Sequence, residues 1–196
     1  MPPPSAESGA PARGASRKPR ADAERNRARV LAAARELFTA RGDEVQMPDV
    51  ARAAGVGIGT VYRHFPSRTA LIAAAGEQRH AEIVEFARAE CLTRSDAAEG
   101  LAAYLHRIGE VLAADRGLSA PVEAAFGSTE PTGEVQAEGL RVAGDLLARA
   151  KAQGAVRADV EVTDLNMIAC GLAAIIRTGS GDWRRYLRIA CAGLRP

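Results

Sequence analysis

Apolar residues recur at helical spacing along most of this chain. No segment alternates apolar and polar residues with the period of two that a half-buried strand requires. Alanine, arginine and leucine dominate the composition, and all three favour helix. A first apolar stripe, in a helix expected from about residue 23, consists of Val30, Leu31, Ala34, Leu37 and Phe38. The sequence therefore predicts an all-α fold.

The remaining pattern divides the chain into three parts. Proline and glycine interrupt residues 1–21, which have almost nothing to bury, so we expect a disordered basic tail there. We expect a helical domain over 22–68 and a second over 69–196, with a loop at Gly127–Gly133. Beyond the first helix, the predicted helices span 47–54, 58–64, 67–90, 96–115, 120–126, 134–153, 163–176 and 182–192.

Composition excludes several classes of protein. Three cysteines without a CxxC pair argue against a disulfide framework or a structural zinc site. The longest apolar run, Met167–Ile176, is too short to cross a membrane, and the N-terminus lacks the apolar core of a secretory signal. Together these features lead us to expect a cytoplasmic protein. No Ser/His/Asp set or phosphate-cradling loop is recognisable, so we expect a protein that is not an enzyme and needs no metal or cofactor.

Charge is distributed unevenly along the chain. Residues 1–68 carry 12 Lys or Arg against 7 Asp or Glu, whereas residues 69–196 carry 14 against 17. A basic N-terminal third favours a polyanionic partner at that end. Two roles stay open for the basic residues of the tail: insertion into a DNA minor groove, or non-specific, salt-sensitive attraction while solvated.

Two short predicted helices joined by a glycine-containing turn occupy residues 47–65. A helix-turn-helix needs this arrangement, because its first helix crosses the DNA backbone and its second presents side chains to base edges in the major groove. Gly55 suits the sharp turn, and Val61 and Phe65 can face inward. Helix-turn-helix spacing alone is a weak signal, since many small helical pairs share it.

The residues themselves are more specific than the spacing. The stretch DVARAAGVGIGTVYRHFPSRTAL, residues 49–71, strongly resembles the DNA-binding signature of the TetR family of transcriptional repressors. Upstream, Val30-Leu31, Ala34, Leu37-Phe38 and Arg41-Gly42 match the first helix of that signature. The resemblance covers about residues 25–72, and the rest of the chain has the length and helical pattern of the family's second domain.

The resemblance implies a set of DNA contacts. Thr60 would contact a phosphate or a base, and Arg63 a base edge or phosphate. Tyr62, His64 and Arg68 would contact phosphates. The N-terminus of the following helix, for which Ser67 is the expected N-cap, would hold another phosphate. Gly57 and Gly59 stand where the family often has base-reading side chains, and Gln46 stands where it often has a helix-capping Thr or Ser. The predicted contact residues are Gln46, Ile58, Thr60, Tyr62, Arg63, His64, Ser67 and Arg68.

The family's second domain forms a dimer and binds an effector, and we expect both functions of residues 69–196. Apolar and small residues on the last two helices favour a four-helix interface between two subunits. The predicted interface consists of Leu165, Ala169, Leu172, Ala173, Ile176, Trp183, Tyr186 and Leu187. Burial of the same helices within one subunit is the alternative. The predicted pocket, for an apolar or amphipathic ligand, consists of Tyr104, Ile108, Leu112, Phe126, Leu140, Leu147, Met167 and Cys170.

The sequence therefore predicts a homodimeric repressor that binds a palindromic double-stranded DNA operator and loses affinity when a small-molecule effector binds. A helical enzyme or ligand-binding protein with an incidental helix-turn-helix is the first alternative. A DNA-binding activator, or a regulator without a ligand, is the second.

Overall fold

A computed structural model of the protein describes residues 17–126 and 133–196. Within these ranges the chain forms helices and no strand, as the sequence predicts. The helices are α1 (Arg17–Arg41), α2 (Met47–Ala54), α3 (Ile58–His64), α4 (Arg68–Phe86), α5 (Ala97–Ala114), α6 (Arg116–Phe126), α7 (Glu134–Ala152), α8 (Val162–Thr178) and α9 (Trp183–Gly193). A 3₁₀ turn, Gly42–Glu44, follows α1, and a π-helical turn, Ala87–Cys91, follows α4.

Two helix starts differ from prediction. Helix α1 begins at Arg17, so residues 17–21 are helical and the predicted tail is too long. Pro19 is compatible with this because it lies in the first turn, where its missing N–H costs no hydrogen bond. Helix α6 begins at Arg116 and not near residue 120, which leaves Pro121 inside the helix. The rest of the predicted tail, residues 1–16, and most of the predicted loop, residues 127–132, lie outside the described residues.

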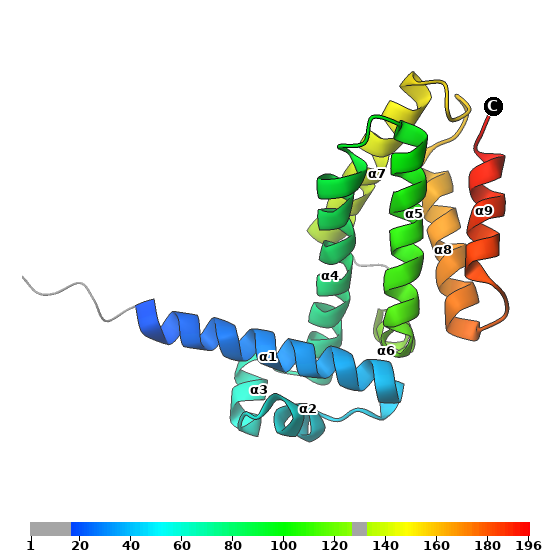
Figure 1. Ribbon diagram of the computed structural model, residues 1–196. Helices are drawn as coiled ribbons and strands as arrows, with labels where there is room; N and C mark the ends of the chain where they lie inside the picture. The colour runs from blue at the N-terminus through cyan, green and yellow to red at the C-terminus, as the bar shows by residue number, and fades with distance from the viewer. Residues whose placement is uncertain (1–16, 127–132) are drawn as a thin grey trace, which may run out of the picture.

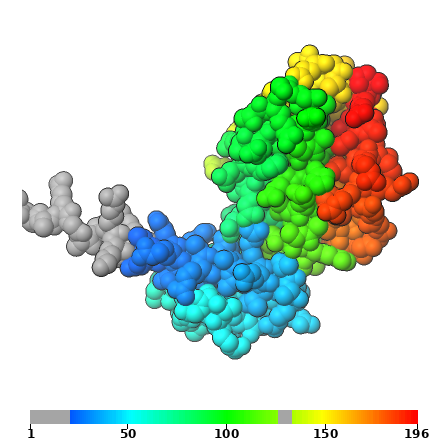
Figure 2. Space-filling view, in the orientation of Figure 1, coloured from blue at the N-terminus to red at the C-terminus, as the bar shows by residue number. Residues whose placement is uncertain are grey.

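The helices form two lobes (Figures 1 and 2). In the smaller lobe α1 crosses α2 and α3. The core of this lobe contains Phe38, Val50 and Val61. Helix α4 rises from this lobe into the larger one, where it runs alongside α5 and α7, with α8 and α9 beyond (Figure 1). The core of the small lobe also takes in Leu71 and Ile72 of α4, so it extends past the predicted boundary at residue 68.

Helix α6 lies where the lobes meet. Its Leu118 and Val122 complete the core of the small lobe. Gly117 allows the two backbones to touch, because a Cβ there would lie 2.3 Å from the Phe38 carbonyl oxygen of α1. An ion-pair cluster closes the same junction: Arg35 of α1 bonds to Glu82 of α4 and, at 2.5 Å, to the Asp115 carboxylate between α5 and α6.

No helix in the described ranges is long and apolar enough to cross a membrane.

Candidate DNA-binding surface and effector cavity

The turn between α2 and α3 is fixed by local chemistry. Gly55 ends α2 in the left-handed region, at φ 64° and ψ 39°, which glycine adopts without strain. The Arg29 guanidinium, from α1, donates to the Ala54 carbonyl at 2.6 Å and so caps the same helix end. At the other end of α2 the Asp49 carboxylate accepts the Gln46 N–H at 3.3 Å. The helix therefore starts where predicted, although glutamine is a poor cap.

Helix α3 has a buried face and an exposed face. Val61 and Phe65 are buried in the small lobe, as predicted. Tyr62 is 48% exposed, and Ile58 and Arg63 are exposed as well. Thr60 and His64 are half-buried beside them. Five of the predicted contact residues thus lie on one short helix, and each is exposed or half-buried.

Two glycines, Gly57 and Gly59, leave the start of this helix without side chains. A Cβ built on Gly57 or Gly59 meets no atom within 4 Å, so both positions border open space. Neither glycine has a positive φ, which means that the backbone there does not require glycine. The lack of side chains allows another molecule to approach the backbone amides of the helix start closely.

Arg68, a predicted phosphate contact, makes several contacts within its own chain. Its Nε donates to the Val45 carbonyl at 2.9 Å, and its Nη2 donates to the Asp43 carbonyl at 2.9 Å and carboxylate at 2.7 Å. The guanidinium also lies over the Phe38 ring, 5.5 Å from its centroid. Arg68 therefore ties the segment before α2 to α4, and its role as a phosphate contact stays a prediction. Ser67 caps α4, as predicted, by accepting the Ala70 N–H at 3.0 Å.

Sequence reasoning missed one exposed cation next to this surface. The Arg52 side chain, on α2, is 81% exposed, with its Nη1 3.6 Å from the Asp49 carboxylate. Arg52 falls at an unspecified position of the family signature, which gave no reason to select it. Its place on the first helix of the pair is the signal that could have found it, because that helix crosses the phosphate backbone.

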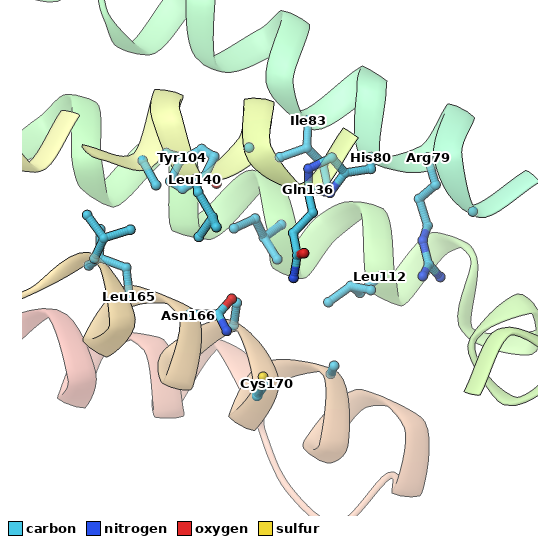
Figure 3. A pocket seen from close by; sticks show the side chains of 17 residues that line it. Arg79, His80, Ile83, Tyr104, Leu112, Gln136, Leu140, Leu165, Asn166 and Cys170 are labelled. Atoms are coloured by element: carbon cyan, nitrogen blue, oxygen red, sulfur yellow. The ribbon is translucent and has the colours of Figure 1, made fainter. Parts of the chain in front are cut away.

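The larger lobe contains a cavity between α4, α5, α7 and α8 (Figure 3). It has a volume of about 840 Å³, its open mouth included. Leu140 and Cys170 are exposed, which places the mouth between α7 and α8. The lining residues are Gly76, Arg79, His80, Ile83, Tyr104, Ile108, Leu112, Gln136, Gly139, Leu140, Ala143, Val162, Leu165, Asn166, Ala169, Cys170 and Ala173.

The predicted pocket overlaps this cavity in part. Tyr104, Ile108, Leu112, Leu140 and Cys170 line it. Leu147 is buried in the core and does not line it, and Met167 is 63% exposed on the outer side of α8. Phe126 is the last residue of α6, and its side chain lies outside what the structure describes. The prediction missed the polar lining residues Arg79, His80, Gln136 and Asn166.

Most residues of the predicted dimer interface face the interior of their own subunit, so for these the interface prediction fails. Six are buried in the core of the larger lobe: Leu165, Leu172, Ala173, Ile176, Trp183 and Leu187. Ala169 and Tyr186 are half-buried and pack against the same core. Apart from Cys170 at the cavity mouth, the apolar residues that these helices do expose are Met167, Ala174, Ile189 and Ala192, which we call the outer α8–α9 face.

Two family models match the chain in sequence. Residues 30–75 match the model of bacterial regulatory proteins of the TetR family, and residues 96–196 match the SbtR-like transcriptional regulator C-terminal domain. The chain belongs to the TetR family of transcriptional regulators. A TetR-family chain of this kind is a DNA-binding regulator of transcription, with a helix-turn-helix domain followed by a helical domain.

Solved structures agree with this family. The chain is 39% identical to a TetR transcription regulatory protein from Mycobacterium vanbaalenii, with a TM-score of 0.65 over 90% of this chain and 99% of that one. It is 33% identical to the TetR transcriptional regulator SCO0520 of Streptomyces coelicolor, with a TM-score of 0.63 over 87% of this chain and 98% of that one.

A curated relative matches over a shorter stretch. The HTH-type transcriptional regulator SAR0097 of Staphylococcus aureus is 43% identical over 58 residues, which are 28% of this chain and 30% of that protein.

Proposed function

We propose that this TetR-family regulator acts in the cytoplasm as a homodimer that binds a palindromic double-stranded DNA operator. In this proposal a small-molecule effector, bound in the cavity, lowers the affinity for the operator. The observation that carries the DNA half of the proposal is the exposed polar face of α3, which stands on a buried core and borders two bare glycines. Such a helix fits the major groove with its N-terminal residues toward the bases.

The proposed DNA contacts are of two kinds: phosphate contacts that position the protein on the duplex, and base contacts that recognise the sequence. Tyr62 and His64 hydrogen-bond phosphates, and the capped N-terminus of α4 at Ser67 holds another. Arg63 reads a base edge, for which its planar guanidinium is suited. Ile58, Thr60 and Gln46 complete the surface as apolar and polar contacts, and the exposed Arg52 adds a phosphate contact from α2.

The proposed dimer uses the outer α8–α9 face. Met167 and Ile189 are large apolar side chains that are 63% and 62% exposed, on two helices that pack against each other. Pairing two copies about a two-fold axis would bury these side chains and present two copies of α3. Each copy would then reach one half-site, with half-sites about 34 Å or a multiple apart.

The proposed response to effector is a shift between two populations. A ligand that binds better when the cavity is expanded favours a dimer in which the two copies of α3 no longer match successive major grooves. Helix α6 and the Arg35 cluster connect the lobes, so a change around the cavity can reach α1.

A selection experiment tests the proposed function. Full-length protein is used to enrich random duplexes, and the DNA flanking its own gene is footprinted. We expect a palindrome, a protected region of two half-sites, and affinity that falls steeply with salt. An Arg157→Gln variant serves as control, because Arg157 pairs with Asp159 far along the chain from α3. Binding without sequence preference would contradict the proposal.

A further inference from the structure

The cavity has a one-sided charge. Among its described lining residues Arg79 is the only arginine or lysine, and no aspartate or glutamate is present. Arg79 lies at one end of the cavity, near Leu112, and Tyr104, Leu140 and Leu165 lie toward the other end (Figure 3). Gln136 and Asn166 contribute neutral amides between these ends. A ligand that fills the cavity therefore meets a cation at one end and hydrocarbon at the other.

Arg79 is buried and hydrogen-bonded in this position. Its side chain is 4% exposed, and its Nη1 donates to the Ser119 hydroxyl of α6 at 3.2 Å. The nearby Asp115 carboxylate bonds to Arg35 at 2.5 Å. Burial lowers the pKa of Arg79, and the Asp115 charge opposes that effect. A guanidinium removed from water gains more from an added anion than an exposed one does, because the local dielectric constant is low.

Most of the other lining residues are apolar. Ile83, Ile108, Leu112, Leu165 and Ala173 come from α4, α5 and α8 and line the space next to Arg79 and beyond it. These side chains offer a hydrocarbon chain a surface that excludes water, but they offer a polar head nothing. The planar fork of the guanidinium matches the two oxygens of a carboxylate.

We infer that the cavity binds an amphiphile whose carboxylate pairs with Arg79 and whose hydrocarbon tail extends toward Tyr104 and Leu165. This inference rests on the proposed effector role of the cavity and names the chemical class of the ligand. The head group would sit beside Ser119, at the junction with α6, so the ligand's charge lies at the end of the cavity nearest the small lobe.

Calorimetry with three probes of equal tail length tests the inference: decanoate, decanol and decyltrimethylammonium, all below their micellar concentrations. With the full-length protein we expect decanoate to bind at least about tenfold more tightly than decanol, and the cation most weakly. In Arg79→Met we expect that preference to disappear, with decanol affinity changed by less than about threefold. Methionine fills the same space without a charge, and replacing a buried charge in this way often preserves stability.

Controls separate charge from folding. Arg157→Gln removes one exposed positive charge and should keep the full preference for decanoate. Circular dichroism checks that each variant is folded, and Arg79→Gln replaces Arg79→Met if the latter is not. The ratio of decanoate to decanol affinity is compared within each folded variant.

Three outcomes would overturn the inference: equal binding of decanoate and decanol by the unaltered protein, a preference that survives in the folded Arg79 variant, or no binding of any probe. Operator binding is measured in parallel without amphiphile. Operator binding without a decanoate preference would refute this inference and leave the proposed regulator intact. A decanoate preference without operator binding would support this inference and refute the proposed regulator.

Discussion

The exposed face of α3 and the cavity of the larger lobe use polar groups in opposite ways. On α3 the polar groups of Tyr62 and Arg63 are in water and border two glycines without side chains. In the cavity one guanidinium, that of Arg79, is almost fully buried beside the Ser119 hydroxyl, in a mostly apolar lining. The first surface belongs to the smaller lobe and its core, whereas the second is a cavity in the larger lobe.

Because of this difference, substitutions on the two surfaces should affect ligand binding and folding stability differently. Exposed side chains can be replaced at little cost to folding, because water solvates what remains, so their substitution should change binding alone. Buried groups contribute to packing and binding together, so their substitution should change both. The comparison therefore predicts which variants lose DNA affinity while they remain fully folded.

The largest expected effect comes from the outer α8–α9 face. Ile189→Arg places a charge on the proposed dimer interface but on a side chain that is exposed within the subunit. The monomer fraction should rise, and operator affinity should fall by about 10²–10⁴-fold, because two linked half-sites become one. Sedimentation velocity and fluorescence anisotropy measure both. Ala102→Arg, an exposed position on α5, is the matched control, and an undisturbed Ile189→Arg dimer would place the interface elsewhere.

Replacing Gly117 of α6 or Gly59 of α3 with alanine should have opposite effects on the stability of the fold. A Cβ on Gly117 would lie within 2.4 Å of two carbonyl oxygens of α1, so Gly117→Ala should destabilise the fold by about 1–3 kcal/mol. Gly59→Ala adds its methyl to open space and should leave thermal stability unchanged or slightly higher. Denaturant unfolding of both variants decides this, and equal stabilities would remove the backbone contact between α6 and α1.

Arg63→Ala should alter which operator is preferred. Loss of a bidentate contact to a base costs about 1–3 kcal/mol at the position that it reads and relaxes selection there. The melting temperature should not change, since Arg63 is exposed. Parallel selections with the unaltered protein and the variant test this, and recovery of the same consensus would refute base reading by Arg63.

Tyr62→Phe should have the smallest effect. The phenol oxygen is proposed to bond only to phosphate, so its loss should weaken binding to every duplex alike, by about 0.5–1.5 kcal/mol. The salt dependence should be retained, because no charge is removed. Titrations against the operator and an unrelated duplex check the uniformity; a loss confined to the operator would assign Tyr62 a base contact.

Local signals predicted the small lobe well. The bounds of α2 and α3 follow from a proline in the first turn, a glycine C-cap and a stop before Pro66, each of which acts within a few residues. Ser67 as a cap is equally local. The contacts of Arg68 could not be predicted in this way, because its partners Val45 and Asp43 lie more than twenty residues away and become neighbours only in the folded chain.

The larger lobe needed information that periodicity does not contain. An apolar stripe shows that a face is covered but not by which molecule, so Leu172 and Ala173 were assigned to a partner subunit when their own subunit buries them. Arg79 did leave a signal: it falls four residues after Ala75 and four before Ile83, on the apolar stripe of α4. A lone arginine on such a stripe indicates a buried charge.

The bare start of α3 has a consequence for how this regulator can change its target. Gly57 and Gly59 have ordinary backbone angles and face open space, so many other residues could replace them without a clash. Each replacement would add a side chain at the surface proposed to meet the bases, while the buried Val61 and Phe65 keep the helix in place. A single substitution at either glycine could therefore add a base contact and change the operator preference, in divergence after gene duplication or in deliberate redesign.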